Sequence, residues 1–373
     1  MATDRTRPRA SRAWTFLSVA LMLALMACSS AAPSPAPAKP AAPAAAAGAP
    51  AAQAPAPAGA ASTAPAAPIK VKIATTVVAA ALALPYLAQD TGIYQRNGIE
   101  PEITMVGPGP LAVQALMAGE MDIAYNTGSS LVAANVGGGD LVMLAGGLNT
   151  LIFSIVADPS ITRLEDLRGK RIGITRFGTS SDFAARYALR QIGLSPDTDV
   201  QLVQMSEIPA IYQGMLAGAL DAGVLSHPGL VAAKQQGYRV LVDVGSLGVE
   251  YQHTGVMAAR RYVDGNPEAA RRIVKSHVEA IHKFKTDKAA AIDSLGRLTQ
   301  TDDMAILEDT WDAYANTYFS RVPYATVPGL QFDIDALATT VPAAAGVRAD
   351  AFVDNRFVDE LVKSGYIDSL YGR

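Results

Sequence analysis

The loop between residues 175 and 181 carries the side chains best suited to holding a charged ligand. It combines one arginine, one glycine and three successive hydroxyl residues, namely Arg176, Gly178, Thr179, Ser180 and Ser181. Hydroxyl residues are natural N-caps, so a helix should begin here and leave its first backbone N–H groups unpaired. Those N–H groups and the positive end of the helix dipole attract anions, and Arg176 adds a fixed charge. The loop is therefore either an anion site or an ordinary, well-capped turn without a ligand.

A strand and a helix must hold this loop in place. Residues 171–175 form a short apolar run that is typical of a buried strand. After the loop, Phe183, Tyr187 and Ile192 form the apolar stripe of a helix. The loop then follows the carboxyl end of a strand, which is where open α/β sheets bind their ligands.

The chain repeats itself at an offset of 99 residues. The matching pieces are residues 72–74 with 171–173, 116–119 with 215–218, and 141–143 with 240–242. One long period seen twice indicates a duplicated domain, because a solenoid needs three or more short repeats.

Each copy alternates strands with helices, which predicts an α/β fold with parallel strands covered on both faces. The repeat brings four loops to equivalent places, at residues 75–78, 126–130, 175–181 and 225–228. Two lobes facing each other across a cleft follow from this arrangement. Residues 69–157, including an apolar strand at 151–157, should form the first lobe, and residues 158–246 the second.

The remaining residues, 247–373, should return to the first lobe and then become helical. Helical spacing covers residues 267–285, 288–298 and 302–320, and two more helices are expected near 333–341 and 354–364, after a break at 329–334. We expect these C-terminal helices to pack on the outside of the first lobe.

The first 27 residues have the pattern of an export signal. Arg5, Arg7, Arg9 and Arg12 precede an apolar run at residues 14–27, which is too short to span a membrane securely. The run ends in Leu-Met-Ala-Cys, which is similar to a bacterial lipobox, and Cys28 is the only cysteine of the chain. We therefore expect Cys28 to be the lipidated first residue of a lipoprotein. A plain signal peptide that is cleaved further downstream is the alternative.

Residues 28–68 contain mostly Ala, Pro, Ser and Gly, so they should form a disordered tether. At ~3.1 Å per residue, its contour would reach on the order of 120 Å. Without the four arginines and Asp4 of the signal, the 31 basic and 34 acidic residues leave an acidic chain. Since no basic stripe with aromatic residues is present, a nucleic-acid partner is not expected.

Several longer runs give the sequence a family resemblance. They are PYLAQDTGIYQRNGIE at 85–100, ALMAGEMDIA at 115–124, LEDLRGKRIGITRFGTSSD at 164–182, LAGALDAGVLSHP at 216–228 and SGYIDSLY at 364–371. With these runs the chain resembles the substrate-binding components of bacterial ABC importers. It is similar to the nitrate/sulfonate/taurine-type, NMT1/THI5-like branch of the type II periplasmic binding proteins.

The resemblance implies two Rossmann-like lobes with mixed, mostly parallel sheets, which are joined by two crossings and close on a small solute. It implies capture of an anionic organic solute, of the sulfonate, carboxylate or pyrimidine-precursor class, by a monomer outside the cytoplasm. Delivery to a membrane permease with a separate ATPase would follow, without a cofactor, a metal or chemistry on the solute.

The resemblance also carries a set of ligand-facing positions. They are Thr76, Asn126, Thr127, Ser129 and Asn149 in the first lobe, Arg176, Gly178, Thr179, Ser180, Ser181, Ser226 and His227 in the second, and Tyr251 on the returning strand. Arg176 is the charged anchor in this interpretation, and the hydroxyl and amide groups fix the orientation of the solute.

Enzyme classes lack their motifs in this sequence. There is no GxSxG elbow and no GxxxxGK[ST] loop. The four histidines show no metal-binding spacing: His277 and His282 are expected on a solvated helix face, and His253 is expected to be a hydrogen-bonded strand residue rather than a site residue. One relative of the implied fold makes a thiamine pyrimidine with a cysteine-rich motif, which is missing here. A ligand-sensing lipoprotein that docks on a receptor stays open as the other alternative.

Overall fold

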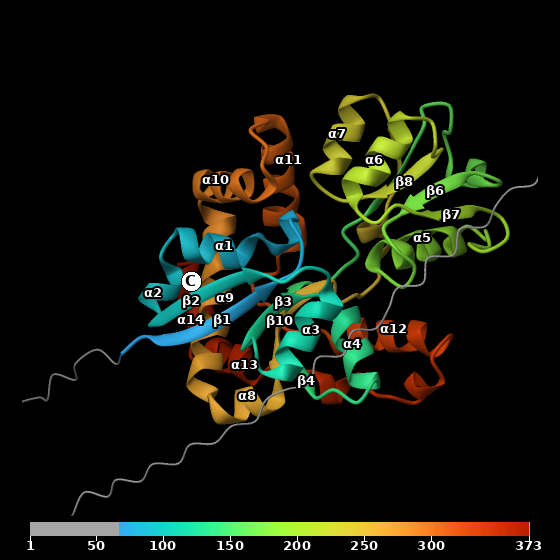
Figure 1. Ribbon diagram of the computed structural model, residues 1–373. Coiled ribbons are helices and arrows are strands. Elements are labelled where there is room, and N and C mark those ends of the chain that lie inside the picture. The colour runs from blue at the N-terminus through green and yellow to red at the C-terminus, as the bar shows by residue number, and fades with distance from the viewer. Residues whose placement is uncertain (1–66, 373) are drawn as a thin grey trace, which may run out of the picture. The chain divides into compact units, whose positions relative to one another are not determined.

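The computed structural model describes residues 67–372 (Figure 1). The expected signal, Cys28 and nearly all of the tether lie outside these residues. Within them, no helix combines the length and apolar character that crossing a membrane requires.

Two five-stranded sheets form the framework of the described chain. The first has the order β2 (Ile99–Met105), β1 (Ile69–Thr75), β3 (Ile123–Asn126), β10 (Thr254–Ala259) and β4 (Leu141–Leu148). The second has the order β7 (Gln201–Gln204), β6 (Arg171–Ile174), β8 (Ala222–Leu225), β5 (Ser154–Ala157) and β9 (Arg239–Asp243). In each sheet only the fourth strand, β10 or β5, runs antiparallel to its neighbours. The expected α/β class with mixed, mostly parallel sheets is confirmed.

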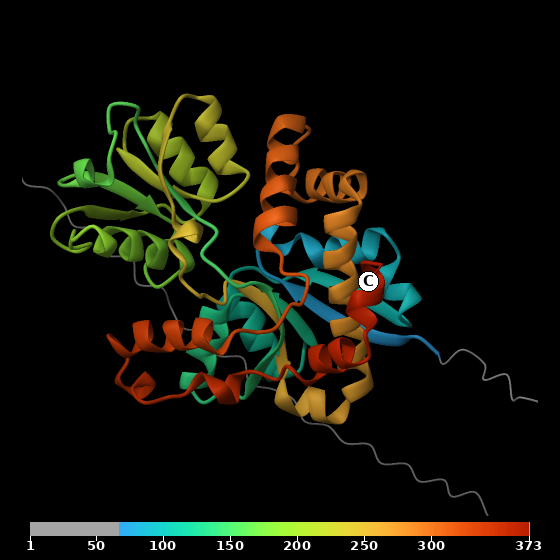
Figure 2. The same cartoon turned by 180° about the vertical axis from the view of Figure 1, so that it is seen from behind.

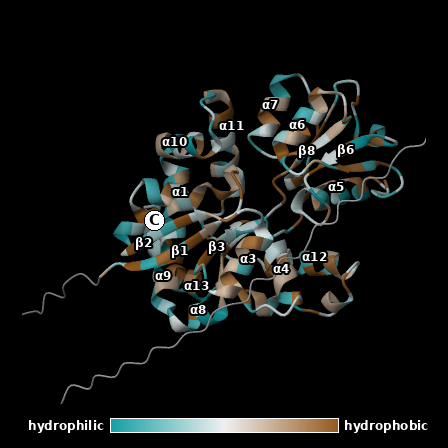
Figure 3. Cartoon of the chain, viewed as in Figure 1, coloured by the Kyte–Doolittle hydropathy of each residue, from teal (hydrophilic) through white to brown (hydrophobic). Residues whose placement is uncertain are grey.

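Helices connect and cover the strands. The first lobe contains α1 (Ala83–Asp90), α2 (Ile93–Arg96), α3 (Gly109–Ala118) and α4 (Gly128–Val136), and the second contains α5 (Ser180–Gln191), α6 (Ile208–Leu216) and α7 (Gly229–Gln235). Figure 3 shows strands and helices in which hydrophobic and hydrophilic residues are mixed. Apolar burial stabilises each lobe, since all eight residues of β4 in the first sheet and all four residues of β8 in the second are buried.

The C-terminal helices pack on the first lobe, as expected. They are α8 (Arg260–Gly265), α9 (Pro267–Thr286), α10 (Lys288–Thr299), α11 (Met304–Ala313), α12 (Val327–Ala338), α13 (Arg356–Lys363) and α14 (Tyr366–Leu370). The long helix α9 packs against α1 and α13, and α12 packs against α4. Figure 2 shows them from behind, in orange and red, beside the first sheet.

The internal repeat is confirmed by hydrogen bonds that recur 99 residues apart. The Lys72 backbone N–H donates to Asp122 Oδ2 over 2.9 Å, and the Arg171 N–H donates to Asp221 Oδ2 over the same distance. The register repeats as well, because Ile73 pairs with Ile123 in the first sheet and Ile172 pairs with Ala222 in the second. In each lobe, the same hydrogen bond from a backbone N–H to an aspartate carboxylate therefore connects the first strand of the repeat to the start of the third.

Two predicted element boundaries are wrong. Residues 151–157 were expected to form a strand of the first lobe, but β5 is shorter and lies in the second sheet, between β8 and β9. An apolar run indicates burial and does not say which sheet receives the strand. The expected break at residues 329–334 lies inside α12, whose N-cap residue Thr326 accepts a hydrogen bond from the Gly329 N–H over 3.2 Å.

Candidate functional site

Side chains from both lobes and from one crossing meet at Tyr251. This tyrosine is completely buried, and its hydroxyl lies 3.1 Å from Ser180 Oγ at the start of α5. Ser129, at the start of α4, also neighbours the hydroxyl. Burial, and secondly the charge of Asp333, raises the pKa of Tyr251 well above its usual range. The hydroxyl therefore stays protonated and can donate one hydrogen bond at this meeting point.

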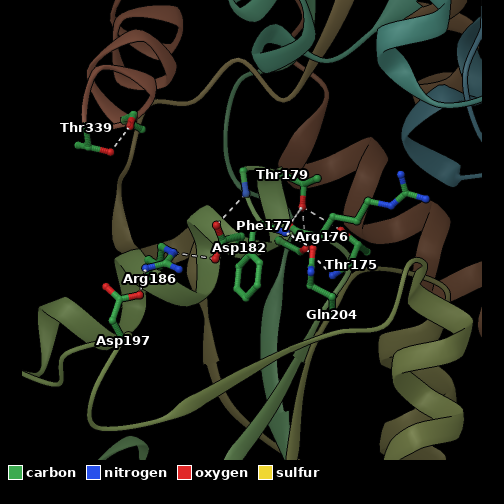
Figure 4. A network of polar contacts seen from close by, with 12 residues as sticks. Thr175, Arg176, Phe177, Thr179, Asp182, Arg186, Asp197, Gln204 and Thr339 are labelled. Atoms are coloured by element: carbon green, nitrogen blue, oxygen red, sulfur yellow. Dashed lines mark hydrogen bonds and ion pairs between the residues drawn. The ribbon is translucent and has the colours of Figure 1, made fainter. Parts of the chain in front are cut away.

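The loop of residues 175–181 is braced by its own side chains (Figure 4). The Thr175 N–H donates to Ser181 Oγ over 2.9 Å, and Thr179 Oγ1 donates to the Arg176 carbonyl over 2.7 Å. Gly178 has a φ of +74°, which a residue with a side chain rarely adopts, and its N–H donates to Asp182 Oδ2 over 2.9 Å. The expected hydroxyl groups of Thr179 and Ser181 thus serve the loop itself.

The beginning of α5 keeps free donors, as the sequence predicted. Thr179 is the N-cap residue, but its side chain makes no capping hydrogen bond. The backbone N–H groups of Ser180, Ser181 and Asp182 have no hydrogen-bond partner among the described residues. Arg176 is exposed, and no residue in the described range forms an ion pair with it. This end of the helix can attract an anion through its N–H groups, its dipole and the nearby guanidinium group.

One acidic group stands in the same helical turn and is already neutralised. Asp182 is buried, and its Oδ1 lies 2.7 Å from Arg186 Nε. Arg186 also contacts Asp197 over 2.7 Å, as Figure 4 shows. The arginine thus offsets the charge of Asp182 and leaves the N–H groups of the turn available.

The corresponding loop of the first lobe is partly committed to internal contacts. The Asn126 side chain donates to the Gly109 carbonyl over 2.9 Å and accepts from the Thr127 N–H over 2.7 Å. Thr127 caps α4 and lies 3.1 Å from Ser129 Oγ. Among these three expected site residues, Ser129 is the one that neighbours Tyr251, and Asn126 shapes the loop.

The other expected residues lie at separate places. Asn149 braces the crossing, since it donates to the Tyr324 carbonyl over 2.8 Å and accepts from Gln252 Nε2 over 3.0 Å. Thr76 follows β1, is buried, and has no side-chain hydrogen bond within the part of the chain that the structure describes. Ser226 is half-buried beside His227, after β8.

His227 connects the second lobe to α11. Its Nε2–H donates to Asp309 Oδ2 over 3.2 Å, and its ring lies 6.3 Å from the ring of Tyr314. Burial lowers the pKa of His227, although the nearby Asp309 charge opposes that shift. The residue that the sequence placed near a solute therefore also forms a contact between lobes.

The expectations for the other histidines need correction. His277 is buried, and its Nε2–H donates to the Gly146 carbonyl over 2.9 Å, so the expected solvated face is wrong. His282 is half-buried, and its ring lies 4.7 Å from the ring of Tyr371. The apolar face of α9 is wide enough to include both rings. His253 is buried without a side-chain hydrogen bond among the described residues, and packs 6.1 Å from the ring of Tyr251.

Two residues of α12 that the sequence analysis missed belong to this region. The ring of Phe332 lies 5.8 Å from that of Tyr251 and 6.1 Å from that of Phe183. Asp333 is buried, near the Tyr251 hydroxyl. The sequence of α12 mixes polar and apolar residues, as any helix that covers a core does. That pattern could therefore not reveal that Phe332 and Asp333 lie beside Tyr251.

No group of three or more His, Cys, Asp or Glu residues within residues 67–372 has the spacing of a metal site. The polar groups at Tyr251 and α5 can instead bind and orient a small molecule through hydrogen bonds and charge.

Comparisons with known proteins identify the family and the fold of the chain. A family model described as NMT1/THI5 like matches residues 80–291 of the chain. A binding protein of Brucella abortus is 26% identical over 212 residues, which cover 54% of this chain and 62% of that protein. The chain thus matches less than two thirds of this relative's length. An ABC transporter periplasmic binding protein of Brachyspira hyodysenteriae is 27% identical over 143 residues, or 38% of this chain and 40% of that one.

A solved structure resembles the described fold. The alkanesulfonate-binding protein SsuA from Xanthomonas axonopodis pv. citri, bound to MOPS, aligns with a TM-score of 0.63 and 22% identity. The alignment covers 78% of this chain and 99% of that chain, so the two share a fold.

Proposed function

We propose a function from the premise that the chain belongs to the NMT1/THI5-like family and has the fold of ABC-type periplasmic solute-binding proteins. The protein captures a small organic solute with an acidic group between its lobes and delivers it to a membrane permease that a separate ATPase drives. It acts as a monomer, outside the cytoplasm, and does not change the solute.

The acidic group of the solute binds at the start of α5. This assignment rests on one observation: the N–H groups of Ser180, Ser181 and Asp182 have no partner among the described residues, while Arg176 stands exposed beside them. Charge-assisted hydrogen bonds of this kind suit a sulfonate or carboxylate. The hydroxyl groups of Ser180 and Tyr251, which lie next to these N–H groups, then orient the solute.

Apolar side chains support an organic rather than an inorganic anion. Val78 and Phe177 occupy equivalent positions in the two repeats, in the loops after β1 and β6, and are 52% and 51% exposed. Exposed large apolar residues at the rim of a polar site indicate a ligand with an apolar body.

Thermal unfolding in the presence of a panel of acids tests this assignment. Sulfonates or carboxylates that bind should raise the melting temperature of the purified chain through mass action. Arg176→Gln should weaken their binding by about tenfold, the loss of one charge-assisted contact. Arg190→Gln is the matched control, because Arg190 is exposed at the far end of the same helix. If only solutes without an acidic group stabilise the protein, the assignment is wrong.

The lipid anchor is the second part of the proposal and rests on the sequence alone. Cys28 closes a lipobox-like run and is the only cysteine in the chain. Cys28→Ala should therefore move the protein from the membrane fraction to the soluble fraction after cell lysis. Unchanged membrane association of this variant would count against lipidation.

A further inference from the structure

Asp333 is a buried carboxyl group that lacks hydrogen-bond partners. The residue is 2% exposed, and neither Oδ1 nor Oδ2 has a hydrogen bond of ordinary geometry to any residue that the structure describes, although the Tyr251 hydroxyl lies nearby. Buried polar atoms nearly always have a partner, because a buried polar atom without one loses its hydrogen bonds to water and gains none in return. A specific exception such as this one requires an explanation.

The carboxyl group faces the site where the lobes meet. Asp333 lies on α12 and comes close enough to the Tyr251 hydroxyl to raise the pKa of that tyrosine. The same hydroxyl contacts Ser180 at the start of α5. The adjacent residue, Phe332, packs on both Tyr251 and Phe183. Asp333 thus adds a third helix, α12, to the site, beside α4 and α5.

No positive charge in the described chain balances this group. Burial raises the pKa of the Asp333 carboxyl well above its usual range, and the nearby Tyr251 hydroxyl, as a hydrogen-bond donor, opposes that shift without removing it. No charged residue from α4, α5 or the crossing contributes to the shift. The one arginine expected at the site, Arg176, is on the exposed rim. A positive charge brought in from outside would therefore find an unpaired acceptor here.

We propose that Asp333 receives a positively charged nitrogen group of the solute. The inference rests on the proposed function and makes the solute a zwitterion, with its acidic end at α5 and Arg176. An ammonium group donates up to three hydrogen bonds, so it can satisfy both oxygens, and its positive charge favours the ionised form of the buried carboxyl group. The rings of Tyr251 and Phe332 supply faces on which such a cation can rest.

Binding of matched pairs of acids to the purified full chain tests this inference. The probes are β-alanine with propionate, taurine with ethanesulfonate, and p-aminomethylbenzoate with p-methylbenzoate, measured by calorimetry and thermal unfolding. The amine-bearing member of at least one pair should bind the wild-type protein more tightly. Asp333→Asn keeps the size and one acceptor but removes the charge, and should weaken that binding on the order of 30-fold. Asp335→Asn is the control, because Asp335 lies exposed on the same helix.

The possible outcomes separate the two proposals. If acids without an amine bind as tightly as their partners, and Asp333→Asn binds both equally, the inference fails and the acidic-solute proposal stands. If the amine matters but Arg176→Gln does not, the inference stands and the position of the acidic end is wrong. If no amine-bearing probe stabilises the wild-type chain, the inference is overturned. Circular dichroism of Asp333→Asn must match the wild type, and an unfolded variant is replaced by Asp333→Ser.

Discussion

His277 and His253 are neutral histidines enclosed by apolar neighbours. Burial lowers the pKa of each to about 4, and in His277 the hydrogen bond to the Gly146 carbonyl opposes that shift. The ordinary pKa of an unfolded histidine is about 6.5. At a pH between these two pKa values, the two histidines bind protons in the unfolded chain but not in the folded chain. Each histidine therefore contributes stability that is present above about pH 6.5 and is lost as the pH falls toward 4.

Replacing His277 should make the protein less sensitive to acid. Between about pH 7 and about pH 5, the linkage amounts to roughly 2 kcal/mol of unfolding free energy for each such histidine. In His277→Gln the amide can still donate to the Gly146 carbonyl, so we expect a pH-dependent loss about 2 kcal/mol smaller than in the wild type. Urea unfolding at both pH values measures it. His282→Gln is the control: His282 is half-buried, so its replacement should change the pH-dependent loss of stability much less. Equal losses in the wild type and in His277→Gln would contradict a neutral, buried His277.

At the scale of helices and strands, the duplicated unit explains what the sequence could predict. The offset of 99 residues correctly matched β1 with β6 and β3 with β8 as equivalent strands. Each copy needs the same strands and turns, and the same hydrogen bond from a backbone N–H to an aspartate carboxylate. The glycines that end α3 and follow α6, Gly119 and Gly218, both have positive φ angles. Repeated strands, turn glycines and aspartates depend on neighbouring residues, so they could be recognised from the sequence without a structure.

Elements whose position depends on distant partners could not be predicted. The strand β5 leaves the first copy and enters the second sheet, as β10 returns to the first, so each sheet receives its antiparallel strand through a crossing. For α12 the sequence shows an ordinary helix, while its role comes from contact with Tyr251, which is more than 70 residues away. Of the candidate site, the start of α5 could be predicted from N-cap chemistry, but Asp333 could not.

At the scale of the whole described molecule, a few side chains hold the two lobes together. Besides the contact between Ser180 and Tyr251, Asp309 on α11 lies 3.2 Å from His227 Nε2 and 3.9 Å from Lys234 Nζ. Both partners belong to the second lobe, whereas α11 belongs to the helices that cover the first. Binding proteins of this architecture close around a solute by a hinge movement, so contacts of this kind favour the closed arrangement.

Removing the Asp309 carboxylate should therefore shift the protein toward an open arrangement. Its side chain is 42% exposed, so solvent screens the interaction and the loss should be about 1 kcal/mol. In Asp309→Ala this loss predicts a larger radius of gyration in solution scattering without solute, and about fivefold weaker solute binding. Glu308→Ala is the control, because Glu308 pairs with Lys288 on α10, 3.2 Å away, and contacts no residue of the second lobe through that pair. If Asp309→Ala and Glu308→Ala scatter and bind alike, His227 and Asp309 do not control closure, and the hinge equilibrium depends on Tyr251 and the aromatic residues around it.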